Sequence, residues 1–371
     1  MDFYLGTHPL FEAFRLARRI PSKPYLFGAL VRLGAFAWCY CKGEKRQVPA
    51  EFVKFLRTEQ MDRLRRYCPW PSSAAGRKQV SSQGMRFRES KLKRGVQLSI
   101  SLLFFPLSSL ARMLATIGGK YAAPGCVVLY YHAVPETQRE AFARQMDVLL
   151  KWTTPISLVS APTLSPAVRY SAITFDDFFQ NVVSNALPEL KKRTIPATIF
   201  VTTEVLGKRA DWWPESAPER KEEIGSLEEL QGLPPDLIAI GSHTLTHPKL
   251  PLLNERDAHR EIFTSRQILE EWLGRKIATL SFPFGAFNDE LVEWCRQARY
   301  ERVFTTLPTM AFQHPGEFVT GRVKADPTDW PLEFKLKLLG AYRWLPYAFA
   351  LKRRILGFPI ANHRGGSNFR G

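Results

Sequence analysis

From about residue 124 onward, short apolar, β-branched runs alternate with segments of helical periodicity. The runs lie at 126–132, 171–177, 197–203, 236–243, 276–283, 302–306 and 317–323, and the helical segments at 139–152, 182–193, 255–273 and 287–298. Strands that are apolar throughout are typical of a parallel sheet covered by helices on both faces. The pattern therefore predicts an α/β fold, a distorted and nearly closed (β/α) barrel of about seven parallel strands. An open doubly wound sheet is the alternative, but no G-x-G-x-x-G motif follows the first run.

Polar residues stand at the ends of four of these runs. They are His132, the pair Asp176 and Asp177, the pair His243 and His247, and the turn Pro283-Phe284-Gly285. The carboxyl ends of parallel strands meet at one mouth of a barrel, where catalytic groups gather. We therefore expect these residues to converge on one site.

The residue types at these strand ends indicate a metal site. His243 and His247 are four residues apart, so both imidazoles can face one ion from a single helical turn. Two adjacent carboxylates, Asp176 and Asp177, are costly to desolvate unless a cation or a proton compensates them. Two histidines and one carboxylate, with further positions open to water, predict a catalytic divalent metal, with Zn²⁺ first and Co²⁺, Ni²⁺ or Mn²⁺ also tolerated.

Three further roles are expected around this metal. The aspartate that does not bind the ion can accept a proton from an attacking water. The tight turn at Pro283-Phe284-Gly285 can present the Phe284 N–H to a developing oxyanion. His132 is the candidate to protonate a leaving amine, while His314 and His363 lie in loops for which we expect no role.

The stretch from about 124 to 343 resembles the polysaccharide deacetylases, which include chitin-oligosaccharide and poly-N-acetylglucosamine deacetylases. The resemblance runs in order through VVLYYHAV, ITFDDFFQNVVSNALPELKKRTIPATIFVTTEVLG, IGSHTLTHPKL, EIFTSRQILEEWLG and TLSFPFGAFND. It implies a distorted β/α barrel and the removal of N-acetyl groups, less readily O-acetyl groups, from a cell-envelope or exported polysaccharide. A small cyclic amide or a lipid-linked amino sugar is the alternative substrate.

The resemblance also implies a role for each matching residue. It makes Asp176 the base, Asp177, His243 and His247 the metal ligands, the Phe284 backbone an oxyanion donor and His132 a residue that lines the site. Arg322 corresponds to an arginine found late in the family, which either orients the base or pairs with a carboxylate at the surface. Trp212 and Trp213, in the loop after the third run, either stack on sugar rings or pack beneath their own loop.

Two positions, Phe178 and Ser281, depart from the family pattern. Phe178 stands where a glycine usually follows the aspartate pair, and at positive φ it would cost about 1–2 kcal/mol and crowd the metal and the substrate. For that reason a non-catalytic member that binds polysaccharide or a synthase is the rival function. Ser281 replaces a frequent arginine. Asp326-Pro327-Thr328-Asp329-Trp330 matches a late family pattern, but we expect that match to be coincidental.

The positive charge is concentrated near the N-terminus. The chain has a formal charge of +17, and residues 1–95 hold 20 Lys and Arg against 7 Asp and Glu. Such a balance suits anionic membranes, acidic polymers or nucleic acid. The sequence shows no docking motif for nucleic acid, so we do not expect nucleic acid as a partner. We expect a helical basic region over 1–70, a linker over 71–94, an apolar segment over 95–118, the barrel over 120–345 and a basic tail over 346–371.

The apolar segment raises the question of a membrane. Residues 95–111 carry no charge, follow a basic run and contain Pro106, so they could span a bilayer, lie in its interface or pack against the barrel. Arg15 precedes any apolar core, so no cleavable signal peptide is expected. Residues 26–66 resemble the membrane-proximal tail of processive family-two glycosyltransferases, which implies a polysaccharide synthase as partner. Together these features predict a bacterial protein associated with the inner membrane. The five scattered cysteines predict no disulfide framework.

Overall fold

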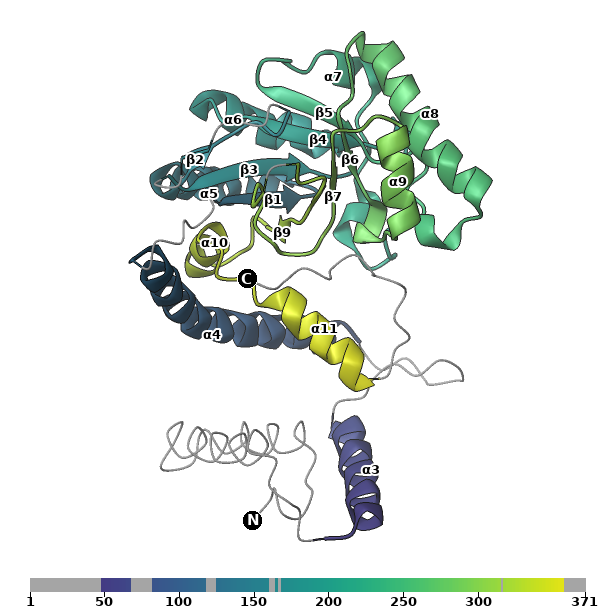
Figure 1. The fold of residues 1–371 in the computed structure, drawn as a ribbon. Coiled ribbons are helices and arrows are strands. Elements are labelled where there is room, and N and C mark those ends of the chain that lie inside the picture. Colours follow the sequence, from purple (N-terminus) through teal and green to yellow (C-terminus); the bar gives the residue numbers. More distant parts are fainter. Residues whose placement is uncertain are drawn as a thin grey trace. The chain divides into compact units, whose positions relative to one another are not determined.

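The computed structural model describes residues 48–67, 82–117, 125–159, 164–165, 168–314 and 316–356. The chain divides into two compact units, Met1–Ser82 and Gln83–Gly371. In the first unit the described part is essentially helix α3, Ala50–Tyr67. It falls inside the region predicted to be helical, and the rest of that region, with most of the glycosyltransferase-like stretch, lies outside the described residues. The sheet and the helices that cover it belong to the second unit (Figure 1).

The second unit is built on one parallel sheet of nine strands. Its strands are β1 Cys126–Tyr131, β2 Thr154–Pro155, β3 Tyr170–Phe175, β4 Ala197–Val201, β5 Ile238–Ser242, β6 Thr279–Ser281, β7 Arg302–Phe304, β8 Val319–Thr320 and β9 Val323–Lys324. Every strand pair is parallel, and the order is β8-β7-β6-β5-β4-β3-β1-β9, with β2 beside β3. Each predicted run contains a strand, so the α/β prediction is confirmed.

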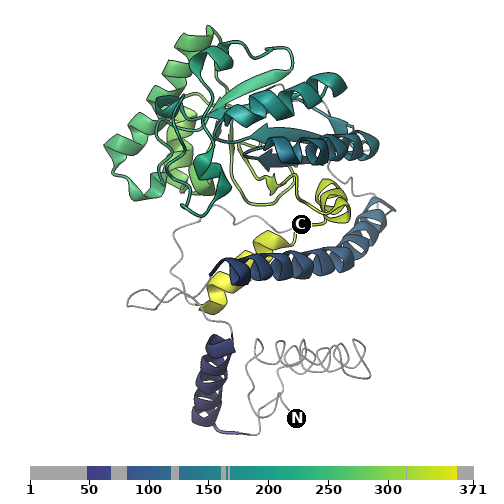
Figure 2. The same ribbon diagram turned by 180° about the vertical axis from the view of Figure 1, so that it is seen from behind.

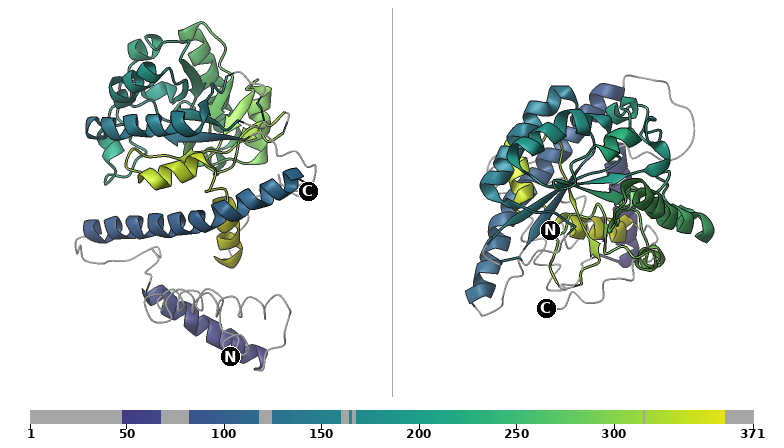
Figure 3. Two further views of the ribbon diagram at one scale, coloured as in Figure 1. Left: turned by 90° about the vertical axis from the view of Figure 1, so that its left-hand side faces the viewer. Right: turned by 90° about the horizontal axis from the view of Figure 1, so that it is seen from above.

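The sheet curls into a distorted half-barrel. Its two end strands, β8 and β9, are separated in sequence by only Gly321 and Arg322. The predicted run at 317–323 therefore contributes to strands at both ends of the sheet. The remaining strands follow one another in chain order without the reversal that defines a doubly wound sheet, which excludes that alternative. Viewed along the barrel, the strands fan out from the centre with helices outside them (Figure 3, right).

Helices cover the outer side of the strands. They are α5 Arg139–Trp152, α6 Leu187–Arg193, α7 Leu227–Gln231, α8 Glu255–Leu273 and α9 Asp289–Gln297, with short turns η1 Glu136–Gln138, η2 Val182–Ala186, η3 Thr203–Val205, η4 Pro218–Lys221, η5 Leu250–Leu252 and η6 Pro283–Gly285. In α8, Asn254 caps the first turn by accepting from Asp257 N–H, and Gly274 ends the helix at φ 60°. Ala258, Ile262 and Leu269 face the strands at helical spacing, which holds α8 on the barrel.

Three more helices flank the barrel, namely α4 Ser82–Ile117, α10 Pro331–Leu338 and α11 Leu345–Leu356 (Figure 2). The structure differs from the predicted linker over 71–94, because residues 82–94 form the first turns of α4. This part holds five Arg and Lys residues together with Gln83, Met85 and Leu92, whose helix propensity outweighs that of its serines and glycine. The predicted tail likewise starts as α11. Among the described residues, no helix combines the length and apolar character needed to cross a membrane.

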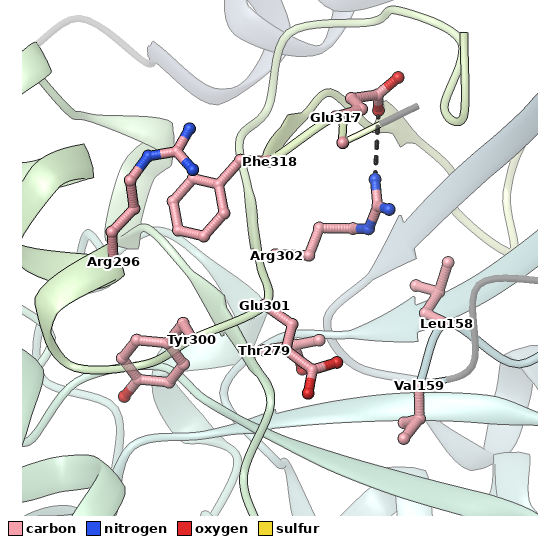
Figure 4. A pocket seen from close by; sticks show the side chains of 10 residues that line it. Leu158, Val159, Thr279, Arg296, Tyr300, Glu301, Arg302, Glu317 and Phe318 are labelled. Carbon is pink, nitrogen blue, oxygen red and sulfur yellow. Dashed lines mark hydrogen bonds and ion pairs between the residues drawn. The ribbon is translucent and has the colours of Figure 1, made fainter. Parts of the chain in front are cut away.

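A cavity of about 510 Å³ opens at the amino ends of β6, β7 and β8 (Figure 4). Thr279 and Arg302 begin β6 and β7, and Phe318 directly precedes β8. Arg302 reaches Glu317 at 3.5 Å on its wall. Because the predicted catalytic residues follow the carboxyl ends of the strands, this cavity lies at the other end of the barrel from them.

Candidate metal centre

Asp177, His243 and His247 come together at the carboxyl ends of β3 and β5. Asp177 Oδ1 lies 3.5 Å from His243 Nε2 and 3.4 Å from His247 Nε2. One ligand atom from each of the three residues lies within 4.8 Å of the others, and all three side chains are buried. The residues predicted to share an ion are therefore neighbours with their donor atoms facing one another.

The spacing of these donor atoms fits a small divalent cation. Zn²⁺ bound tetrahedrally by imidazole nitrogen and carboxylate oxygen sets its ligand atoms about 3.4 Å apart. Asp177 Oδ1 is fully buried and has no hydrogen-bond partner among the described residues. A buried acceptor without a partner is costly, so a cation at this point would satisfy it. These three residues could hold one divalent metal.

The protonation states of the three residues also suit a metal. His243 Nδ1 lies 2.7 Å from the Ser281 carbonyl, to which it donates, so Nε2 presents its lone pair toward Asp177. Burial lowers the pKa of both histidines, which keeps them neutral, the form that binds metals. Burial, with Asp176 beside it, raises the pKa of Asp177 to about 8. A dication would favour the carboxylate and reverse that shift.

Trp212 and Trp213 lie against the ligands. The Trp213 indole N–H donates to Asp177 Oδ2 at 3.2 Å, which leaves Oδ1 for the ion. The Trp212 ring stacks on the His247 imidazole at 4.4 Å between centroids, with 21° between planes. Both indoles are half-buried. Both tryptophans therefore contact metal-ligand candidates, and stacking on a sugar ring stays a prediction.

Asp176 is held by Arg322. The guanidinium donates to both carboxylate oxygens, from Nη1 at 2.7 Å and from Nη2 at 2.8 Å. It also donates to Thr174 Oγ1, Ser281 Oγ and the Thr305 carbonyl. Burial opposes ionisation of Asp176, but the arginine outweighs it and holds the pKa of that carboxyl well below its usual range. Arg322 is fully buried, so the alternative in which it pairs at the surface is wrong.

His132 and Phe284 complete the mouth of the site. The His132 ring lies edge-on to Trp213, 4.9 Å between centroids, and burial lowers its pKa to about 3. The Phe284 ring is half exposed and lies 4.6 Å from the His247 ring. The Phe284 residue has φ 58°, so the turn after β6 is in a left-handed conformation at the position predicted to supply an N–H.

The backbone of the site is unusual for side-chain-bearing residues. Left-handed φ angles occur at Asp177 (71°), Phe178 (59°), Thr244 (68°), His247 (62°) and Phe284 (58°). Such residues cost about 1–3 kcal/mol each and are concentrated at functional sites. The loops that carry two of the three ligand residues are therefore held in strained conformations by their surroundings.

Comparison with known proteins assigns this site to a family. Residues 165–303, which include all three ligand candidates, match the family model described as polysaccharide deacetylase. Residues 165–303 therefore form a polysaccharide deacetylase domain. Members of this family are hydrolases of carbon–nitrogen bonds outside peptides, which agrees with the resemblance drawn from the sequence.

Two relatives of this deacetylase come from Bacillus subtilis (strain 168). YxkH, which is named after the same family, is 24% identical over 211 residues, or 54% of this chain and 71% of YxkH. The peptidoglycan-N-acetylmuramic acid deacetylase PdaC is 31% identical over 137 residues, or 37% of this chain and 26% of PdaC. The solved structure of IcaB from Ammonifex degensii is 26% identical, covers 58% of this chain and 97% of IcaB, and superimposes with a TM-score of 0.49.

Phe178 fits this deacetylase in a different way from the one predicted. The residue does have positive φ, as expected for a glycine position. However, its ring has no exposed surface and lies against Gly225, where an added Cβ would be 2.5 Å from Phe178 Cε1. The ring belongs to the core cluster, so the structure gives it no surface with which to touch a sugar. The expected crowding of the metal and the predicted substrate contact of Phe178 are not seen.

Two positioning residues were missed from the sequence. Glu261 of α8 accepts from the N–H groups of Leu245 and Thr246 and from the Thr246 hydroxyl, so it fixes the loop between the two histidines. Ser281, noted only as a replaced arginine, orients His243 through its carbonyl and Arg322 through its hydroxyl. A glutamate on the buried face of α8 was the available signal. Asp329, from the late motif, pairs instead with Lys337 at 2.7 Å beside α10.

Proposed function

We propose that this deacetylase removes N-acetyl groups from a polysaccharide of the cell envelope or of an exported polymer. The observation that carries the proposal is the unpaired Asp177 Oδ1, which faces two neutral imidazoles. A second carboxylate, Asp176, follows the same strand and is kept ionised by Arg322. A metal-ligand set with an adjacent ionised base is what hydrolysis by water requires.

Asp177, His243 and His247 would hold the divalent cation, with Zn²⁺ as the first candidate. Bound there, such an ion polarises the acetyl carbonyl and lowers the pKa of water toward about 7. Asp176 takes one proton from the water while the oxygen of the water bonds to the carbonyl carbon of the acetyl group. A low pKa makes Asp176 a weak base, but it guarantees that the carboxylate is free of a proton when water arrives.

The amide bond then breaks, and acetate and an amine are released. Asp176 returns the proton it took to the departing nitrogen. The second proton of the water leaves the new acetic acid for the amine or for solvent, so the step needs no other reactant. The Phe284 backbone N–H, in the turn after β6, is our candidate donor to the oxygen that becomes negatively charged. His132 lines the same mouth, and because it is neutral at rest it serves as a hydrogen-bonding group until negative charge develops beside it.

The substrate class follows from the relatives. PdaC is named for a peptidoglycan sugar, and the matching family model is named for polysaccharides. The mouth of this site is ringed by His132, Trp213 and Phe284, which suits the amphipathic faces of a pyranose. A polysaccharide synthase as partner remains a prediction from the N-terminal stretch.

Acetate release from N-acetylglucosamine oligomers tests the proposal. The full chain, loaded with Zn²⁺, is expected to release acetate, and His243→Ala should abolish both metal uptake and release. Asp176→Asn should keep the metal and lose release, because it removes only the base. Exposed His259, stacked on Phe263 in α8, offers a matched control, and His259→Ala should change neither. A metal-loaded chain that leaves every acetylated oligomer intact would contradict the proposal.

A non-catalytic, polysaccharide-binding member is the rival function. Its support was Phe178 at the glycine position and the basic N-terminal extension. Of these, the Phe178 ring packs against Gly225 instead of the metal site. The rival predicts no acetate from any substrate, with polymer affinity unchanged by His243→Ala. The same set of variants therefore separates the two functions.

A further inference from the structure

Helix α4 has one face that fixes it to the barrel domain. That face is formed by Arg94, Leu98, Ser101 and Phe105. Arg94 donates to Glu333 at 2.7 Å, and the Trp344 indole N–H donates to Ser101 Oγ at 2.9 Å. Leu98 and Phe105 pack on the cluster of Leu336, Ala341 and Tyr342. These contacts hold α4 against α10 and the start of α11.

The opposite face of α4 is apolar and exposed. It is formed by Val96, Ile100, Leu103, Leu107 and Leu110, which we call the α4 stripe. At 3.6 residues per turn these five side chains fall within about 80° of arc, opposite the packing face. Their exposed fractions run from 38% at Ile100 to 69% at Leu103 and Leu107. Figures 2 and 3 show α4 as one long, curved helix beside the barrel.

Basic residues precede and follow the α4 stripe in the sequence. By sequence, α4 holds six basic residues, Arg86, Arg88, Lys91, Lys93, Arg94 and Arg112, against the single acidic residue Glu89. Helix α11 adds Lys352, Arg353 and Arg354 with no acidic residue, and it exposes Tyr347 and Phe349. An aliphatic stripe between basic residues complements an anionic lipid surface, whose headgroups attract lysine and arginine while its acyl chains accept the leucines.

The dimensions of the α4 stripe favour a helix that lies on a bilayer. From Val96 to Leu110 the helix rises about 21 Å, against a hydrocarbon thickness of about 30 Å. No described helix is apolar enough to span a bilayer, and the other face of α4 is already occupied by protein. A spanning helix would need an apolar surface all round, whereas an interfacial helix needs one on a single side.

We propose that the α4 stripe binds an anionic bilayer surface, such as that of the bacterial inner membrane, with α4 parallel to the membrane plane. A protein partner is the other occupant such a face could have. Protein interfaces are enriched in aromatic residues and carry polar groups that fix the register, and the α4 stripe has neither. This proposal concerns where the enzyme works and is independent of the reaction assigned to the metal centre.

Vesicle binding by the full chain tests the proposal. Phosphatidylglycerol-containing vesicles are expected to sediment the protein, and phosphatidylcholine vesicles to sediment at least tenfold less. Leu103→Glu with Leu107→Glu should lower binding to the anionic vesicles at least tenfold, without loss of folding, because both side chains are already exposed. Leu150→Glu, on α5 and 42% exposed, is the matched control and should bind like the parent.

A local measurement separates α4 from the N-terminal unit, which has its own apolar and basic residues. Peptides covering residues 96–110 should gain protection from hydrogen exchange when anionic vesicles are added. Undiminished vesicle binding by the double variant, or no added protection over 96–110, would overturn the proposal. So would a chain that binds no vesicles but forms a dimer that the double variant splits, because the α4 stripe would then be a protein interface.

Discussion

Arg322 holds both carboxylate oxygens of Asp176, at 2.7 Å and 2.8 Å, in a place where the arginine has no exposed surface. The two residues come from distant parts of the chain and meet behind the metal centre. The arginine reaches Asp176 from the link between β8 and β9, the two end strands of the sheet. One side chain therefore ties the link between the end strands to the carboxylate of the proposed base.

Arg322→Ala should destabilise the protein by about 3–5 kcal/mol, because it leaves a buried carboxylate without a partner. Urea unfolding measures this loss. Arg144→Ala removes an exposed arginine that pairs with Glu140 at 3.5 Å and should cost less than about 0.5 kcal/mol. Arg322→Lys keeps the charge but loses the two parallel hydrogen bonds of the guanidinium to the Asp176 carboxylate. The carboxylate should then move from its position, and kcat should fall roughly 100-fold. Equal stability of all three variants would mean that the pair contributes nothing.

Gly225→Ala should destabilise the fold by about 1–3 kcal/mol, because the new methyl group meets the Phe178 ring. In a Phe178→Ala background the same change should cost less than about 0.5 kcal/mol, since the ring is gone. Gly95→Ala is the control: nothing lies within 4 Å of its added Cβ, and alanine favours α4. Unfolding free energies of the four chains test the coupling, and additive losses would show that Phe178 and Gly225 do not compete for space.

Trp213→Phe should weaken metal binding about 10- to 100-fold, because it removes the donor that holds Asp177 Oδ2. The ring is retained, so loss of packing is small. Competition with a chelating dye measures the affinity. Trp152→Phe, at the end of α5, should leave it unchanged. If Trp213→Phe binds metal as tightly as the parent, the indole packs beside Asp177 without orienting it.

His132 should stay neutral in the folded protein down to about pH 4. Its pKa of about 3 lies below the unfolded value of about 6.5, so between these limits only the unfolded chain takes up the proton. The contribution of His132 to stability is therefore fully present above about pH 6.5 and falls as the pH drops toward the folded pKa. A bound dication would also lower the pKa of His132.

Nuclear magnetic resonance of the histidine rings, with His132→Gln for assignment, measures this titration directly. The difference in unfolding free energy between parent and His132→Gln should also shrink as the pH falls from 6.5 to 4. If the His132 imidazole titrates near pH 6.5, the folded protein does not keep it neutral. His132 would then again be the candidate acid that protonates the leaving amine.

The strands were predictable from the sequence because each is a continuous apolar run, as burial on both faces requires. The ligand set was predictable because Asp177 and His243 follow strand ends within two residues and His247 stands four residues after His243. The directions of the side chains could not be predicted from the sequence. The left-handed φ of Phe178 could be anticipated from a glycine position, but its turn toward Gly225 depends on a residue 47 positions away that leaves room for a ring.

Long-range pairing set the other limits. Nothing in the sequence EFVTGRV indicates that it forms two separate strands, β8 and β9. The two residues between these strands include Arg322, whose side chain reaches Asp176. The start of α4 was misjudged because serine, glycine and basic residues are common in linkers. Helix-forming neighbours and the contact of Arg94 with Glu333 hold this segment as a helix.

Titration of the metal-free full chain with Co²⁺ tests the metal centre most directly. Absorption of the bound ion in the visible region reports its ligands. The account predicts that the bands saturate at one equivalent and vanish in both His243→Ala and Asp177→Ala, while His259→Ala retains them. Absorption that does not saturate, or that persists at full strength without His243, would contradict a single cation held by Asp177, His243 and His247.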